Sequence, residues 1–274
     1  MEMFEFLKYG FVQRALIAGL FIALLCSTQG VFLVLRRLSL IGDGLAHATF
    51  GTVALALLFK SSPLIVSLPL VMICSIGIMK ITQKMRLYGD AAIGVISSLG
   101  IAGGVMISSL AGGFNVDLFS FLFGSILSIS RLEVYIAIIL SAAVILFLSL
   151  FYNEWLLITF DGESAKAAGI NVKALDNVFA MLTAITVVLS MKVVGIMLIS
   201  SLLILPAVTA LQLARSFRTT MLIAAVSALT SVLTGIIFSF YLDVPTGAAI
   251  VILNLVFFIS AYFYKRISII KNQY

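Results

Sequence analysis

Residues 36–58 read RRLSLIGDGLAHATFGTVALALL, an apolar span that contains Asp43 and His47, the only histidine of the chain. Four residues of α-helix turn through about 400°, so the two side chains are expected roughly 40° apart on one face and about one helical turn apart along the axis. Ionisable residues inside a membrane span are costly and usually functional. Carboxylate and imidazole are also ligands of zinc and manganese. The span therefore predicts a metal-binding pair; the alternative is that both residues only hydrogen-bond to a neighbouring helix.

The composition predicts a membrane protein. Of the 274 residues, 62% are hydrophobic and 10% are charged, against the roughly 45–50% apolar content of soluble domains. The net charge is +6, but the basic residues lie in short loops, which favours a role in topology over a nucleic-acid partner. Cys26 and Cys74 lie in apolar segments without a CxxC motif, so neither a disulfide framework nor a structural zinc site is expected. We expect one transmembrane domain over residues 1–274, in contact with lipid and without a separate soluble domain.

Apolar stretches of about 20 residues predict an all-α, polytopic transmembrane bundle of eight or nine spans. The segment 118–129, LFSFLFGSILSI, is too short to span and is expected to be a re-entrant or interfacial helix. In the span near 91–110, Gly100 and Gly104 form a small-xxx-small pattern, which favours close helix packing. The candidate spans are near 14–35, 38–59, 64–82, 91–110, 133–152, 177–194, 196–214, 219–241 and 246–264.

A cytoplasmic loop is the second candidate site. With the N-terminus outside and the C-terminus inside, most of the 17 lysines and arginines fall on the cytoplasmic side, as the positive-inside rule requires. The longest loop on that side covers residues 155–176, and its centre, 162–168, reads GESAKAA before Gly169. This pattern predicts a short amphipathic helix that Gly169 terminates, suited to docking in a partner's groove. A solvated connector is the alternative.

Four motifs together resemble the permease subunits of bacterial ABC importers for zinc, manganese and iron. The similarity runs in order over nearly the whole chain, so the set is far more specific than any one motif. The motifs are LVLRRLSLIGDGLAHATFG (33–51), DGESAKAAGINV (161–172), VGIMLISSLLILPAVTA (194–210) and DVPTGAAIVI (243–252).

The resemblance implies a transporter of several chains in the bacterial plasma membrane, with residues 1–274 as its single permease domain. A homodimer of permeases would bind two cytoplasmic ATPase subunits and receive the cation from an extracytoplasmic metal-binding protein. Asp43 and His47 would form the intramembrane metal site. The coupling helix would cover residues 163–169, with Glu163, Ala165, Ala168 and Gly169 at the ATPase contact. No resident cofactor is implied, since the divalent cation is the substrate. The sequence of residues 36–51 resembles that of the family's zinc permeases more than that of its manganese permeases.

Two other classes of protein fit the residues less well. A proton- or sodium-coupled secondary carrier would also contain intramembrane ionisable residues, but it needs no docking loop and usually has repeat-related broken helices. An intramembrane metalloenzyme would need three protein ligands for a catalytic zinc, which is difficult with one histidine. The chain contains no GxxxxGK[ST] motif, so ATP hydrolysis is expected from a separate subunit.

Overall fold

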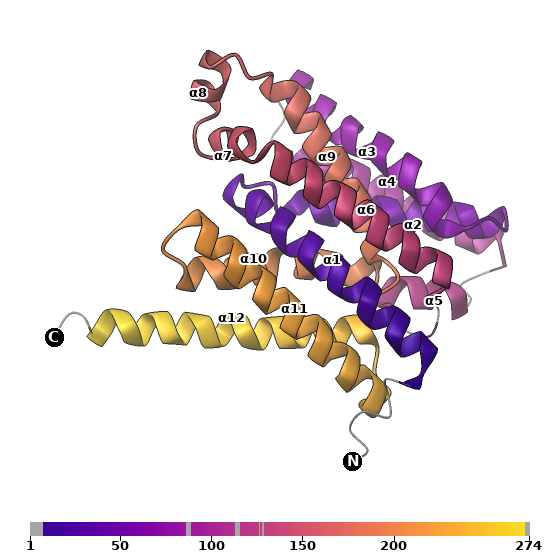
Figure 1. Ribbon diagram of the computed structural model, residues 1–274. Helices are drawn as coiled ribbons and strands as arrows, with labels where there is room; N and C mark the ends of the chain where they lie inside the picture. The colour runs from indigo at the N-terminus through magenta and orange to yellow at the C-terminus, as the bar shows by residue number, and fades with distance from the viewer. Residues whose placement is uncertain (1–7, 86–88, 113–115, 126, 128, 272–274) are drawn as a thin grey trace.

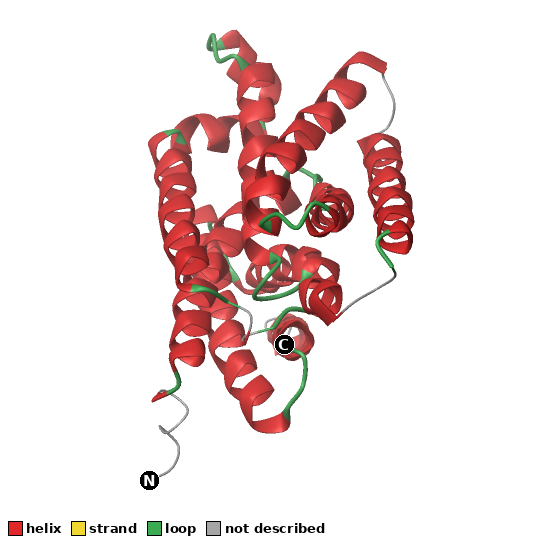
Figure 2. Ribbon diagram, turned by 90° about the vertical axis from the view of Figure 1, so that its right-hand side faces the viewer, coloured by secondary structure: helices red, strands yellow, loops and turns green. Residues whose placement is uncertain are grey.

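The computed structural model describes residues 8–85, 89–112, 116–125, 127 and 129–271, and this part of the chain contains helices and no strands (Figures 1 and 2). The helices are α1 (Gly10–Leu35), α2 (Leu40–Leu58), α3 (Pro63–Met85), α4 (Gly89–Leu110), α5 (Val116–Phe123), α6 (Arg131–Leu150), α7 (Tyr152–Phe160), α8 (Gly162–Ala167), α9 (Val172–Ser190), η3 (Ile196–Leu198), α10 (Ile199–Leu213), α11 (Phe217–Leu242) and α12 (Thr246–Lys271).

Nine helical segments of the described chain are long and apolar enough to cross a membrane. They are α1 to α4, α6, α9, η3 with α10, α11 and α12, which confirms the predicted all-α bundle. An odd number of spans places the two ends of the chain on opposite sides of a membrane. Figure 1 agrees, since α1 begins near one end of the bundle and α12 ends near the other.

The predicted short helix at 118–129 is only partly correct. The structure has the eight-residue α5, which ends at Phe123. Gly124 follows with φ of +78°, a conformation that ends the helix early and that L side chains rarely adopt. Within the predicted segment, Ile126 and Ser128 lie outside the described residues.

The predicted spans 177–194 and 196–214 are separated by a wider break than the sequence indicates. Helix α9 begins at Val172, because the Asn171 side chain accepts a hydrogen bond from the Ala174 amide at 3.1 Å and caps it. It ends at Ser190, and Gly195 then has φ of +89° before η3 and α10. This break sets where α10 begins.

Glycines let other helices approach this broken segment closely. A Cβ on Gly247, at the start of α12, would lie 1.7 Å from the Val194 carbonyl oxygen. A Cβ on Gly124 would lie 2.7 Å from the Val193 carbonyl oxygen. Only glycine fits at both positions. The C-terminal end of α5 and the N-terminal end of α12 therefore pack closely against the break between α9 and η3.

The pair α2 and α4 shows the same close packing, as the small-xxx-small pattern predicts. A Cβ on Gly100 would lie 2.4 Å from the His47 carbonyl oxygen, and one on Gly104 would lie 2.6 Å from the Phe50 ring. Gly103 faces open space, with nothing within 4 Å of an added Cβ. The backbone of His47 is therefore in direct contact with α4.

Candidate cation site and cytoplasmic helix

The structure brings Asp43 and His47 together as the sequence predicts. Both lie on α2, with Asp43 in its first turn, and the Asp43 Oδ2 atom is 3.6 Å from His47 Nε2. The Asp43 side chain is 50% exposed and the His47 side chain 20% exposed in the single chain. Both side chains are therefore partly exposed on one side of the helix.

The distance between these atoms suits a bridging ion better than a direct hydrogen bond. A separation of 3.6 Å exceeds the roughly 3.2 Å limit for a good N–H···O bond. With metal–ligand bonds of about 2.1 Å, one zinc ion between the atoms would subtend about 120°, close to a tetrahedral angle. The separation leaves room for one divalent cation between the two atoms, and the metal-binding role of the pair stays a prediction.

Ser200, in the first turn of α10, is a third member of the site that the sequence reading missed. Its hydroxyl donates a hydrogen bond to Asp43 Oδ1 at 3.1 Å. The two residues are 157 positions apart, and serines are common in membrane helices. The only sequence signal was the SS pair within the motif at 194–210.

The described part of the chain offers no larger metal cluster. No group of three His, Cys, Asp or Glu residues lies close enough there to hold a metal ion. The Cys26 Sγ atom instead contacts the Ser190 hydroxyl at 3.3 Å, and Cys74 is also a free thiol. Within the described residues, Asp43 and His47 therefore form a pair without a third His, Cys, Asp or Glu close enough to complete a cluster.

The predicted short helix is present as α8 (Gly162–Ala167), and its cytoplasmic placement stays a prediction. At its start, Asp161 accepts a hydrogen bond from the Ser164 amide at 3.0 Å and another from the Ser164 hydroxyl. At its end, Gly169 has φ of +84°, its amide donates to the Lys166 carbonyl at 3.0 Å, and the Ile170 amide donates to the Ala165 carbonyl at 3.0 Å. This is the Schellman arrangement that glycine favours.

The Asp161 cap has an electrostatic consequence. The hydrogen bonds from the Ser164 side chain and backbone hold the pKa of the exposed Asp161 carboxyl below its ordinary value, because they favour the charged form. The helix begins next to this negative charge, which also suits its dipole. A six-residue helix is thus fixed at both ends.

One residue expected at the ATPase contact, Ala165, is buried and points away from the free surface of α8. Ala165 is fully buried (0% exposed), so it packs inside the chain and cannot touch a partner. Glu163, Ala168 and Gly169 are exposed, as expected. The correction follows from helical geometry, since one face of α8 must pack against the bundle and position 165 lies on it.

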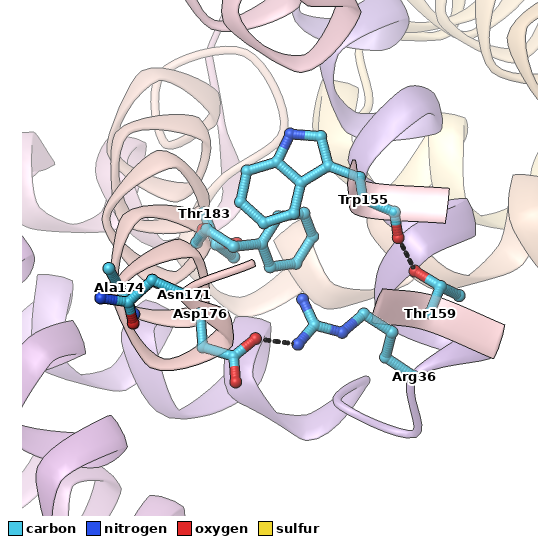
Figure 3. Close-up of polar contacts among 8 residues, drawn as sticks. Arg36, Trp155, Thr159, Asn171, Ala174, Asp176 and Thr183 are labelled. Atoms are coloured by element: carbon cyan, nitrogen blue, oxygen red, sulfur yellow. Dashed lines mark hydrogen bonds and ion pairs between the residues drawn. The ribbon is translucent and has the colours of Figure 1, made fainter. Parts of the chain in front are cut away.

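An ion pair joins the region of α7 to α9 to the turn before α2. Figure 3 shows the Arg36 guanidinium, after the end of α1, facing the Asp176 carboxylate near the start of α9, and the two form an ion pair. The guanidinium also lies 5.2 Å from the centre of the Phe179 ring, which contacts Trp155 of α7. The α7–α8 unit is therefore held near the chain that leads to Asp43. Figure 1 places α7 and α8 at the end of the bundle opposite α5.

The fold and the site define a class of protein: a polytopic helical membrane protein with an accessible carboxylate–imidazole pair in a membrane-spanning helix. Residues 8–265 match the ABC 3 transport family, so the chain belongs to that family. This confirms the resemblance inferred from the four motifs. The prediction of a multi-pass protein of the bacterial plasma membrane is confirmed as well.

Individual relatives agree over almost the whole chain. The chain is 32% identical to the manganese transport system membrane protein MntC of Halalkalibacterium halodurans, over 95% of this chain and 89% of the relative. It is 33% identical to the high-affinity zinc uptake system membrane protein ZnuB of Haemophilus influenzae, over 92% of this chain and 97% of the relative. In structure it resembles a chain of PsaBC from Streptococcus pneumoniae in complex with Fab, with a TM-score of 0.84, 30% identity and coverage of 93% and 92%.

Proposed function

We propose that this chain is the membrane permease of an ATP-driven importer for a divalent transition metal, and that Asp43 and His47 form its transport site. The observation that carries the proposal is the 3.6 Å separation of Asp43 Oδ2 and His47 Nε2 on an accessible face of α2. An open site of few ligands suits transport, because the cation must be released after it binds. Family membership and the names of the relatives support the importer class.

The ligand types define the class of cation. A carboxylate and an imidazole without a thiolate suit borderline cations such as zinc and manganese. Sequence identity does not separate these two metals, since the relatives named for manganese and zinc are 32% and 33% identical to the chain. The sequence of residues 36–51 still favours zinc. Because the two metals are not separated by identity, zinc and manganese uptake must be measured side by side.

Two copies of the chain would complete the site. Zinc normally takes four ligands, and one chain supplies two. A carboxylate that is 50% exposed would be costly against lipid, so the Asp43 face of α2 needs a polar covering. A second copy facing the first would provide both the covering and two more ligands. Native mass spectrometry of the purified permease tests this, and a monomer at all concentrations would contradict it.

The ATPase partner would dock on the exposed face of α8. The small exposed residues Ala168 and Gly169 leave room for a groove to close over the helix, and Glu163 offers a charged contact. Ala168→Trp should therefore reduce co-purification of the ATPase while the permease remains in the membrane. Ala111→Trp, at an exposed alanine after α4 on the predicted outer side, is the matched control. Equal loss in both variants would exclude α8 as the docking helix.

An extracytoplasmic binding protein would deliver the cation on the opposite side.

The decisive experiment measures uptake of radiolabelled zinc and manganese by membranes that contain the complete transporter. Asp43→Asn keeps the size of the side chain but removes its charge, and His47→Ala removes the nitrogen ligand. Each should abolish uptake without reducing permease abundance. Asp90→Asn, an exposed first-turn acid of α4, is the control and should transport normally. Parental uptake by an abundant Asp43→Asn, His47→Ala double variant would refute the site.

A further inference from the structure

Asp43 presents its two carboxylate oxygens to different neighbours. Oδ1 accepts the hydrogen bond from the Ser200 hydroxyl at 3.1 Å. Oδ2 lies 3.6 Å from His47 Nε2. The terminal torsion of an aspartate has broad, roughly two-fold preferences, so an unrestrained carboxylate would exchange and tilt its oxygens freely. The hydrogen bond removes that freedom and leaves one defined oxygen beside the imidazole.

We propose that Ser200 is the positioning residue of the transport site, holding Asp43 so that Oδ2 and His47 Nε2 together face the cation. The inference rests on the proposed function of the Asp43 and His47 pair. Ser200 would act through Asp43, because its hydroxyl donates a hydrogen bond to that carboxylate. Groups that orient metal ligands in this way usually change metal affinity by about 10- to 100-fold when removed.

Contacts outside α2 also hold the segment that carries Ser200. Ser200 is the second residue of α10, and its first-turn position adds the positive end of a helix dipole near the carboxylate. The segment before α10 is anchored from elsewhere: Lys192 Nζ lies 3.4 Å from a Glu133 carboxylate oxygen and 4.4 Å from the centre of the Phe121 ring. The Ser125 amide also donates to the Lys192 carbonyl at 3.1 Å. Ser200 is therefore a fixed reference point for the Asp43 side chain.

Equilibrium binding of radiolabelled zinc to the full-length permease in lipid nanodiscs tests the inference. Ser200→Ala removes the donor and should raise the dissociation constant by about 10- to 100-fold. Ser200→Thr keeps a hydroxyl at the same position and should restore binding close to the parental value. Ser201→Ala is the matched control, because in the described chain its hydroxyl makes no hydrogen bond to Asp43, and it should bind zinc normally.

The outcomes separate this inference from the function on which it rests. Parental affinity in Ser200→Ala, together with weak binding by Asp43→Asn, would overturn only the role of Ser200. Weak binding by Ser200→Thr would also overturn it, since that pattern indicates a packing role for serine and no role for the hydroxyl. Parental affinity in Asp43→Asn would overturn the transport site itself.

Discussion

Gly100 offers a sharp test of how α4 supports the site. An alanine Cβ at this position would lie 2.4 Å from the His47 carbonyl oxygen, 2.6 Å from the His47 carbonyl carbon and 2.7 Å from the Ala48 Cα. All three atoms belong to backbone, so no side chain can rotate away. Ordinary contact begins at 3.4 Å, and α2 and α4 must therefore separate by about 1 Å.

The cost follows from this separation. Overpacking against backbone costs about 3 kcal/mol at the upper end of its range, and the helix preference of alanine over glycine returns up to about 1 kcal/mol. The net loss for Gly100→Ala is about 2 kcal/mol, which lowers the melting temperature by about 4–8 °C for a chain of this size. Functional sites tolerate displacements of only about 0.5 Å, so a 1 Å shift at His47 should reduce cation uptake by about tenfold or more.

The assay combines thermal melting of the purified permease with uptake of radiolabelled zinc by the complete transporter. Gly103→Ala is the matched control, because nothing lies within 4 Å of its added Cβ, and the variant should melt slightly higher and transport normally. Parental melting and uptake in Gly100→Ala would refute the contact between α4 and His47. Equal damage in Gly103→Ala would refute the assignment of the effect to that contact.

Two further predictions concern the Arg36–Asp176 ion pair and the Asp161 cap. The Arg36 and Asp176 side chains are only 10% and 17% exposed, so Arg36→Ala should lower the free energy of unfolding by about 3 kcal/mol, because it leaves the Asp176 charge unpaired. An Arg36→Met, Asp176→Leu double variant should melt at a higher temperature than Arg36→Ala, and an equally low melting temperature would contradict this. The pKa of Asp161 is lower in the folded chain than its ordinary value. The stabilisation that its carboxylate gives to α8 is therefore complete above the ordinary aspartate pKa of about 4, and it is lost as the pH falls through the lower pKa of the folded chain. Hydrogen exchange in α8, corrected for intrinsic rates, should therefore accelerate below about pH 4 in the parental chain and show no such step in Asp161→Asn.

Much of the fold could be predicted because a membrane imposes simple local rules. Every backbone polar group must be satisfied within the span, so a run of about 20 apolar residues predicts a helix wherever it occurs. The nine spans of the described chain follow this rule. The start and end of α8 were also local, since Asp161 and Gly169 act on amides and carbonyls within a few residues of themselves. Asp43 and His47 share a face because they are four residues apart on one helix.

The sequence by itself thus determined the helical architecture, the pairing of Asp43 and His47 on one helix and the short helix α8. Only the tertiary structure decided which groups meet that pair and which face of α8 is free. Ser200 reaches Asp43 across 157 positions, and Ala165 is buried against the bundle; neither follows from a local pattern. The pattern of Gly100 and Gly104 indicated close helix packing, but only the structure shows that Gly100 meets the His47 backbone and that Gly103 faces open space. The reason is that helix periodicity fixes relative directions within one helix, whereas the register and rotation of separate helices are set by packing between them.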